Sequence, residues 1–94
     1  MRPSEALAKH RDEVLAIIAR YPVTNPRVFG SVARGEDVEG SDIDLVVEKS
    51  GALTFFDLFE LEELLRELLG VPVEVFTKLK QPAAQTAAVD SRPL

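Results

Sequence analysis

Hydrophobic and polar positions follow two different periods along the chain, which indicates a mixture of helices and strands. From Ser4 to Tyr21, apolar residues recur at the three-to-four-residue spacing of an amphipathic helix. Ser4 is a suitable N-cap, and Pro22 ends the pattern. The chain should therefore begin with one helix.

A longer helix is predicted from Thr54 to Leu69. Thr54 and Asp57 have the spacing of a capping box, and Gly70 is a suitable residue for ending the helix. Apolar residues at helical spacing predict a buried stripe: Phe55, Phe56, Leu58, Phe59, Leu61, Leu64, Leu65, Leu68 and Leu69. The acidic residues between them should face solvent: Glu60, Glu62, Glu63 and Glu67.

Three short segments rich in β-branched residues predict strands, over residues 27–29, 42–48 and 71–77. Asn25-Pro26 is a turn signal before the first strand, and residues 31–35 are predicted to form one or two helical turns after it. The order of elements is therefore α-β-α-β-α-β. It predicts a single α/β domain of the α+β type over residues 1–94, with a mixed sheet of about three strands flanked by helices.

The end of the chain has weak periodicity. Residues 78–94 are rich in alanine and are expected to form a loosely ordered tail, with a short helix in this tail as the alternative.

Composition narrows the class of protein. The chain has 94 residues, 46% of them hydrophobic and 29% charged, which fits one globular domain. Its net charge of −5 argues against nucleic-acid binding, and the absence of cysteine excludes disulfides and cysteine-ligated zinc. No apolar run is long enough to span a membrane and the start of the chain lacks a signal-peptide pattern, so a cytoplasmic location is expected.

A glycine and a serine follow the first predicted strand. Gly30 would allow a phosphate to approach the backbone, and the Ser31 hydroxyl and the free N–H groups of the next turn could donate to it. Arg34 could neutralise part of the charge. Taken alone, the same residues could also form a plain turn.

Two aspartates bracket Ile43 at the start of the second predicted strand. Because side chains alternate along a strand, Asp42 and Asp44 should share one face, where two carboxylates repel by about 3 kcal/mol at roughly 5 Å. Solvent, an arginine or a divalent cation could offset this repulsion, and Mg²⁺ prefers such oxygen ligands. Glu74 interrupts the apolar run of the third strand and would join them if the two strands are neighbours; otherwise it is an exposed edge residue.

The two motifs together resemble a known family. Gly30-Ser31, ten further residues and Asp42-Ile43-Asp44 resemble the nucleotidyltransferase superfamily of DNA polymerase beta. The fuller pattern, Gly-Ser-Val-Ala-Arg-Gly followed by Ser-Asp-Ile-Asp-Leu in a chain this short, is similar to the minimal nucleotidyltransferase family. The resemblance extends over residues 14–77.

The resemblance implies a polymerase beta-like domain that binds a nucleoside triphosphate, ATP, as its substrate. It implies that Gly30 and Ser31 hold the β- and γ-phosphates and that Arg34 faces them. The reaction would be attack on the α-phosphorus with loss of pyrophosphate.

The resemblance also implies a metal site of Mg²⁺, with two ions. Asp42, Asp44 and Glu74 would be both the metal ligands and the catalytic carboxylates. In this family the third acid is usually aspartate, and Glu74 departs from that pattern by about one methylene.

Minimal members of the family often act with a small helical protein called HEPN. The resemblance implies an antitoxin that moves AMP from ATP to a tyrosine of a HEPN toxin. A module with weak catalysis that neutralises a HEPN-type partner by occlusion is the alternative. His10, the only histidine of the chain, is expected to be a surface residue.

Overall fold

A computed structural model describes residues 1–77 and 91–94. The helices in these residues are α1 (Pro3–Lys9), α2 (Arg11–Ile18), α3 (Ser31–Arg34) and α4 (Phe55–Leu69). The strands are β1 (Val23–Phe29), β2 (Ile43–Lys49), β3 (Val73–Phe76) and β4 (Arg92–Pro93). None of the helices in the described part of the chain is long and apolar enough to cross a membrane.

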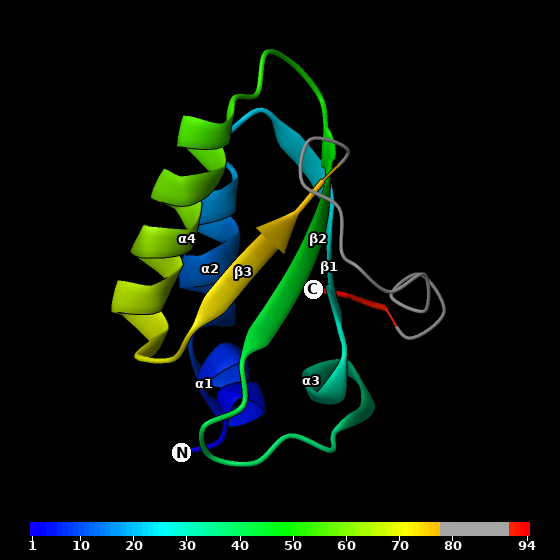
Figure 1. Ribbon diagram of the computed structural model, residues 1–94, viewed down its shortest axis with the longest axis vertical. Helices are drawn as coiled ribbons and strands as arrows, with labels where there is room; N and C mark the ends of the chain where they lie inside the picture. Colours follow the sequence, from blue (N-terminus) through cyan, green and yellow to red (C-terminus); the bar gives the residue numbers. More distant parts are fainter. Residues whose placement is uncertain (78–90) are drawn as a thin grey trace.

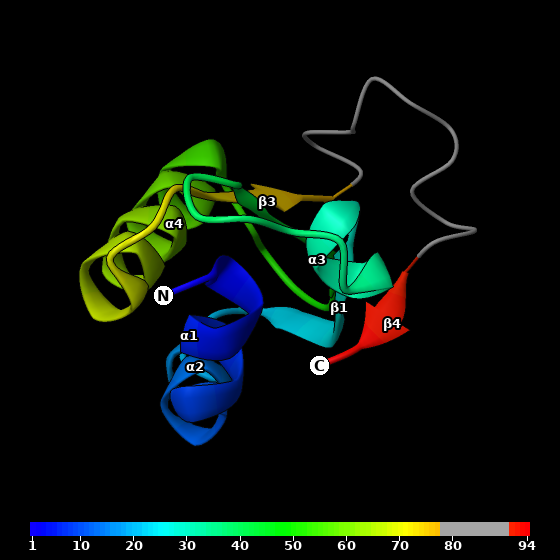
Figure 2. The ribbon, with the colours of Figure 1, turned by 90° about the horizontal axis from the view of Figure 1, so that it is seen from below.

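The strands form one mixed sheet in the order β3-β2-β1-β4 (Figure 1). β1 is antiparallel to both β2 and β4, whereas β2 and β3 are parallel. A parallel pair needs a crossover connection, and α4 provides it. Helices α1, α2 and α4 lie on one side of the sheet, while α3 lies toward the other side, at the end of β1 (Figure 2). The predicted α+β class and the mixed sheet are confirmed, with four strands in place of about three.

The core lies between the sheet and α1, α2 and α4. Along β2, Ile43, Leu45 and Val47 are buried on the helix side, whereas Asp44 and Val46 belong to the opposite, partly exposed face. Burial of each such aliphatic side chain stabilises the fold by roughly 1.5–3 kcal/mol. The sheet thus uses one face for stability, and its other face, called here the open face, carries the polar groups.

The last residues of the chain pair with the sheet. Arg92 and Pro93 lie opposite Val28 and Arg27, and the Arg27 side chain donates to the Ser91 hydroxyl at 2.9 Å. The prediction of a loose tail is therefore wrong for residues 91–94. The alternative, a short helix in the tail, falls on residues of which 78–90 lie outside the described part of the chain.

The first strand is longer than the sequence predicts. Asn25-Pro26 does not turn the chain but lies inside β1, where the register with β2 shifts between Thr24 and Arg27. Asn25 has a φ of 50°, a left-handed conformation that asparagine tolerates better than most residues. Asn25 and Pro26 therefore form an irregularity within a strand in place of the predicted turn.

The first predicted helix is two helices, because it breaks at His10 between α1 and α2. Its N-cap is Arg2, so the prediction of Ser4 is wrong. The backbone N–H of Ser4 instead donates to the buried carboxylate of Asp37 at 2.8 Å. A residue of the loop after α3 thus performs the capping role for α1.

The ends of α4 agree with the prediction. The Asp57 N–H donates to the Thr54 hydroxyl at 3.2 Å, and the Thr54 N–H donates to the Asp57 carboxylate at 3.0 Å. Gly70 follows the helix in the left-handed conformation with a φ of 69°. The capping box and the glycine were therefore sufficient to predict where this helix begins and ends.

The prediction for the faces of α4 is wrong in two places. The described helix buries Leu58, Leu61, Leu65 and Leu69, while Phe55, Phe56 and Phe59 are 48%, 85% and 52% exposed. Phe56 and Phe59 are turned away from the leucine stripe by the helical period, and Phe55 is at its margin in the first turn. Glu62, four residues after Leu58, is in phase with the stripe and is buried.

Glu62 protects the outer edge of the sheet. Its carboxylate accepts the N–H of Val75 in β3 at 2.7 Å and lies 3.7 Å from the Arg66 guanidinium. An unpaired edge N–H would otherwise be available to another strand. The buried charge therefore joins α4 to β3.

We expect Glu62→Ala to lower the free energy of unfolding by about 1–3 kcal/mol, because it leaves a buried N–H without its acceptor. The matched control is Glu63→Ala, which removes an exposed carboxylate paired with Arg66 and should cost at most about 1 kcal/mol. Urea unfolding monitored by circular dichroism gives both values. Equal losses in the two variants would contradict the role of Glu62.

Asp37 gives a second prediction. Burial acts to raise the pKa of Asp37, but hydrogen bonds from Ser4 outweigh it and the pKa lies below its usual value. The stabilisation is therefore present at neutral pH and lost as the pH falls through the pKa of the folded state. We expect Asp37→Ala to cost about 0.5–2 kcal/mol, with a deficit that shrinks in acid. Glu39→Ala, an exposed change in the same loop, is the control, and thermal melts between neutral and acidic pH provide the test.

Candidate active site

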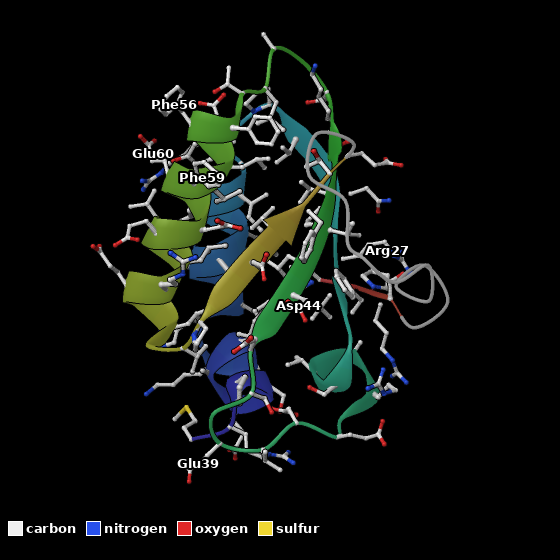
Figure 3. The ribbon with its side chains drawn as sticks, viewed as in Figure 1. Arg27, Glu39, Asp44, Phe56, Phe59 and Glu60 are labelled. Carbon is white, nitrogen blue, oxygen red and sulfur yellow. The ribbon has the colours of Figure 1, made fainter. Side chains whose placement is uncertain are left out.

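Two of the three predicted carboxylates lie side by side on the open face of the sheet. In the parallel register of β2 and β3, Asp44 is opposite Glu74. Asp44 is half-buried, and Figure 3 shows it on β2 near the middle of the sheet. The condition on which the role of Glu74 depended, that the two strands are neighbours, is met.

Asp42 lies just before β2 and completes a group of negative charges. It is exposed, and its charge acts on Asp44 together with that of Glu74. Burial first, and then the charges of Glu74 and Asp42, raise the pKa of Asp44. Phe29, opposite Asp44 in the antiparallel register, adds apolar surface, since its ring contacts Phe76 with centroids 5.6 Å apart.

The glycine-serine motif meets this carboxylate group. Gly30 follows β1 with a φ of 78° and a ψ of −153°, and a Cβ at this position would lie 3.5 Å from the Asp44 Oδ2. The positive φ favours glycine, and the absence of a side chain keeps the space beside Asp44 accessible. Ser31, half-buried, begins α3 directly after it. Two motifs separated by ten residues in sequence are thus adjacent in space.

Arg34 lies elsewhere. Its guanidinium pairs with Glu36, and the residue lines a cavity of about 400 Å³ between α1, α3 and residues 92–94. That cavity contains none of the three carboxylates. The His10 Nδ1 donates to the Glu13 carboxylate at 2.9 Å, at the junction of α1 and α2 on the helix side of the sheet.

A second cavity, of about 460 Å³, opens beside the carboxylates. Asp42, Pro72, Val73 and Glu74 line it from the sheet, and Phe59, Glu62, Glu63 and Arg66 line it from α4. We call it the β3–α4 pocket. It lies on the β3 side of Asp44, whereas Gly30 and Ser31 lie on the β1 side.

The donor set of this site suits a hard divalent cation. Carboxylate oxygens are the preferred ligands of Mg²⁺, and a cation would relieve the repulsion that raises the pKa of Asp44. Across residues 1–77 and 91–94, no three or more acidic, histidine or cysteine side chains are arranged so that they could hold a metal ion by themselves.

Sequence reasoning missed two buried acids: Glu62, which lines the β3–α4 pocket, and Asp37, which contacts α1. Glu62 had a signal, because its spacing from Leu58 and Leu65 places it in the buried stripe of α4. Asp37 had none, since its partner Ser4 is 33 residues away in the chain.

Comparison with known proteins agrees with this geometry. The family model for the nucleotidyltransferase domain matches residues 7–94. A provisionally named protein adenylyltransferase of Methanocaldococcus jannaschii is 40% identical over 74 residues, covering 79% of this chain and 83% of that protein. The protein adenylyltransferase MntA of Thermococcus cleftensis is 38% identical over 82 residues, covering 85% and 80%.

Solved structures extend the likeness to three dimensions. A structure assigned as a minimal nucleotidyltransferase superposes with a TM-score of 0.81 at 36% identity, covering 97% of this chain and 95% of that one. The MNT antitoxin in complex with the tri-AMPylated HEPN toxin of Shewanella oneidensis shares the fold, with a TM-score of 0.64 at 16% identity over 92% of this chain and 69% of the other.

This chain belongs to the nucleotidyltransferase domain family. Within it, the chain is a minimal nucleotidyltransferase, an enzyme of the transferase class.

The like-charge contact at Asp44 makes a prediction. Asp44→Asn removes the repelled carboxylate, so in buffer containing a chelator at neutral pH we expect a melting temperature higher by a few degrees. Because the pKa of Asp44 is raised, the gain should shrink as the pH falls and the parent carboxyl becomes protonated. Glu48→Gln, with the same charge change on an exposed position of β2, is the control. A lower melting temperature for Asp44→Asn than for the control would contradict the prediction.

Proposed function

We propose that this enzyme is a protein adenylyltransferase that moves AMP from ATP to a tyrosine hydroxyl of a HEPN-type toxin and thereby acts as its antitoxin. The names of the archaeal relatives support the transfer of AMP to protein. The toxin complexes of proteins with the same fold support the partner. The proposal depends chiefly on one observation, the meeting of Gly30 with the Asp44–Glu74 pair on the open face.

In this proposal the nucleotide lies along the open face. The Gly30 backbone and the Ser31 hydroxyl hold the β- and γ-phosphates, because they lie at the end of β1 next to Asp44. The Ser31 O–H donates to a phosphate oxygen, and the positive φ of Gly30 exposes the backbone for close approach. Arg34 has less support as a phosphate ligand, since it faces another cavity and pairs with Glu36.

Asp42, Asp44 and Glu74 are the proposed ligands of Mg²⁺, with two ions as the family resemblance implies. When bound, the ions would neutralise charge on the α-phosphate and favour the deprotonated form of the attacking hydroxyl. The chain's own part is to place Asp44 opposite Glu74 on neighbouring strands, with Asp42 directly before β2. Glu74, on the strand beside Asp44, would also lie nearest to a hydroxyl arriving over β3.

The reaction balances without further reactants. The acceptor oxygen forms a bond to the α-phosphorus, the bond between the α-phosphorus and the bridging oxygen breaks, pyrophosphate leaves, and the hydroxyl proton passes to solvent. The positions of Gly30 and Glu74 on opposite sides of Asp44 suit this in-line displacement.

The second candidate function is neutralisation of a HEPN-type partner by occlusion without efficient transfer. It is favoured by Glu74, which is exposed and longer than the aspartate usual in the family, and by the finding that no three acids among the described residues are arranged to hold a metal by themselves. The two functions differ in whether the partner gains mass.

The test is transfer from labelled ATP with Mg²⁺ to a purified HEPN-family protein of the same genome, followed by mass spectrometry of the partner. We expect one or more AMP groups on a tyrosine. Asp42→Asn and Asp44→Asn should lower the rate at least about a hundredfold, and Ser31→Ala should weaken nucleotide binding by about 1–3 kcal/mol.

The control for these variants is Glu48→Gln, which should transfer at the parent rate. Glu74→Gln separates a metal ligand from an edge residue, since only the former loses transfer. Full activity of Asp44→Asn would contradict the proposed site. A parent that binds and silences the partner without modifying it would instead establish occlusion.

A further inference from the structure

Three phenylalanines on α4 remain unexplained by the fold. Phe55, Phe56 and Phe59 are 48%, 85% and 52% exposed, and the rings of Phe55 and Phe59 stack with centroids 6.3 Å apart. Single exposed apolar residues are ordinary, but adjacent aromatic rings on one helix form a patch that solvation disfavours. Figure 3 shows Phe56 and Phe59 along the first half of α4. We call these three residues the aromatic patch.

The aromatic patch is continuous with the active site. Phe59 belongs to the patch and also lines the β3–α4 pocket, whose other walls include Asp42 and Glu74. Phe55, Phe59, Glu62 and Arg66 follow one another at spacings of four, three and four residues, so they lie along one flank of α4. That flank faces β3, because Glu62 accepts the Val75 N–H. A surface leads from the patch directly to the carboxylates.

The β3–α4 pocket lies on the side of Asp44 from which the attacking hydroxyl of the acceptor has to arrive. Gly30 and Ser31, the proposed phosphate ligands, lie on the β1 side of Asp44. In-line displacement places the attacking oxygen opposite the leaving pyrophosphate. The attacking group therefore arrives from the β3 side, where the β3–α4 pocket opens. This step rests on the proposed function.

Charge defines the partner further. The exposed acids of α4 are Glu60, Glu63 and Glu67, and the single basic residue of the helix, Arg66, pairs with Glu63. A partner surface with apolar side chains surrounded by lysine or arginine complements such a face. A second copy of the chain would bring the same acids together and be repelled.

We infer that the aromatic patch and the β3–α4 pocket form the docking surface for the acceptor protein, which meets them with an apolar centre and a basic rim. The partner's hydroxyl would enter the pocket beside Glu74 while its apolar side chains cover Phe55, Phe56 and Phe59. Phe59 is then a positioning residue shared by the patch and the pocket.

The test measures acceptor affinity and transfer separately, with the HEPN-family protein of the transfer assay as the probe. Phe56→Ala and Phe59→Ala should each weaken its binding, measured by isothermal titration calorimetry, at least about tenfold. In transfer, the KM for the acceptor should rise while the Kd for ATP and the melting temperature stay at parent values, because these side chains are largely exposed. Val38→Ala, an equally exposed apolar position outside the patch, is the matched control and should change nothing.

Charge gives a second arm. Glu63→Lys should weaken acceptor binding, and the parent's affinity should fall with added salt. Asp44→Asn should bind the acceptor like the parent while losing transfer, which separates docking from chemistry.

The outcomes distinguish this inference from the proposed function. Transfer with unchanged acceptor affinity in both phenylalanine variants overturns the docking surface alone. Binding without transfer, still weakened in those variants, supports the surface and overturns the proposed activity. A parent that does not bind the protein, or that forms a dimer dispersed by Phe56→Ala with acceptor affinity unchanged, overturns the inference.

Discussion

The parallel register of β2 and β3 is the constraint on which the remaining features depend. It places Asp44 beside Glu74 on the open face, and it aligns Ile43 with Val73 and Leu45 with Val75 on the buried face. Because side chains alternate along a strand, a shift of one residue would exchange the two faces of β3. It would bury Glu74 and expose two valines. The requirement for a core thus fixes the relative positions of the carboxylates.

Carboxylates on the open face lower the stability of the fold, although they are the groups that a metal site would need. The folded protein would be more stable with a protonated Asp44 or with a neutral residue in its place, since burial and two neighbouring charges act against the ionisation of Asp44. The helix side of the sheet compensates through fully buried aliphatic residues of β2, β3 and α4. Glu62 shows the contrary case, because its buried carboxylate is satisfied by the Val75 N–H and so contributes to the fold.

The sequence correctly predicts those structural features that depend on a few consecutive residues. The cap of α4 at Thr54, its end at Gly70, and the placement of Gly30 after a strand each follow from a few neighbouring residues. The adjacency of Asp44 and Glu74 could be stated only as a condition. A helix separates the two strands in the sequence, and the residues of neither strand reveal that the two strands pair. Asp37 could not be found at all, since its partner belongs to another element.

The phenylalanines of α4 show a different limit. The hydrophobicity of a side chain indicates that it tends to be buried, but it does not indicate which surface buries it. The phase of α4 and the position of the sheet leave Phe55, Phe56 and Phe59 outside the core that the described residues form. The prediction counted all apolar residues of α4 as one wide buried stripe, because the sequence does not say how wide a face of the helix the sheet covers.

The cap that Asp37 provides for α1 has a consequence for the loop that carries Asp42. Asp37 is held by Ser4, and four residues later the Ser41 hydroxyl accepts the Val38 N–H at 3.0 Å while the Ser41 N–H donates to the Val38 carbonyl at 3.0 Å. Asp42 follows this closed turn directly. The loss of backbone entropy that ordering Asp42 requires therefore occurs during folding rather than when a ligand arrives. The polar loop between α3 and β2 is in this sense preorganised, through its contact with α1 and through its own turn.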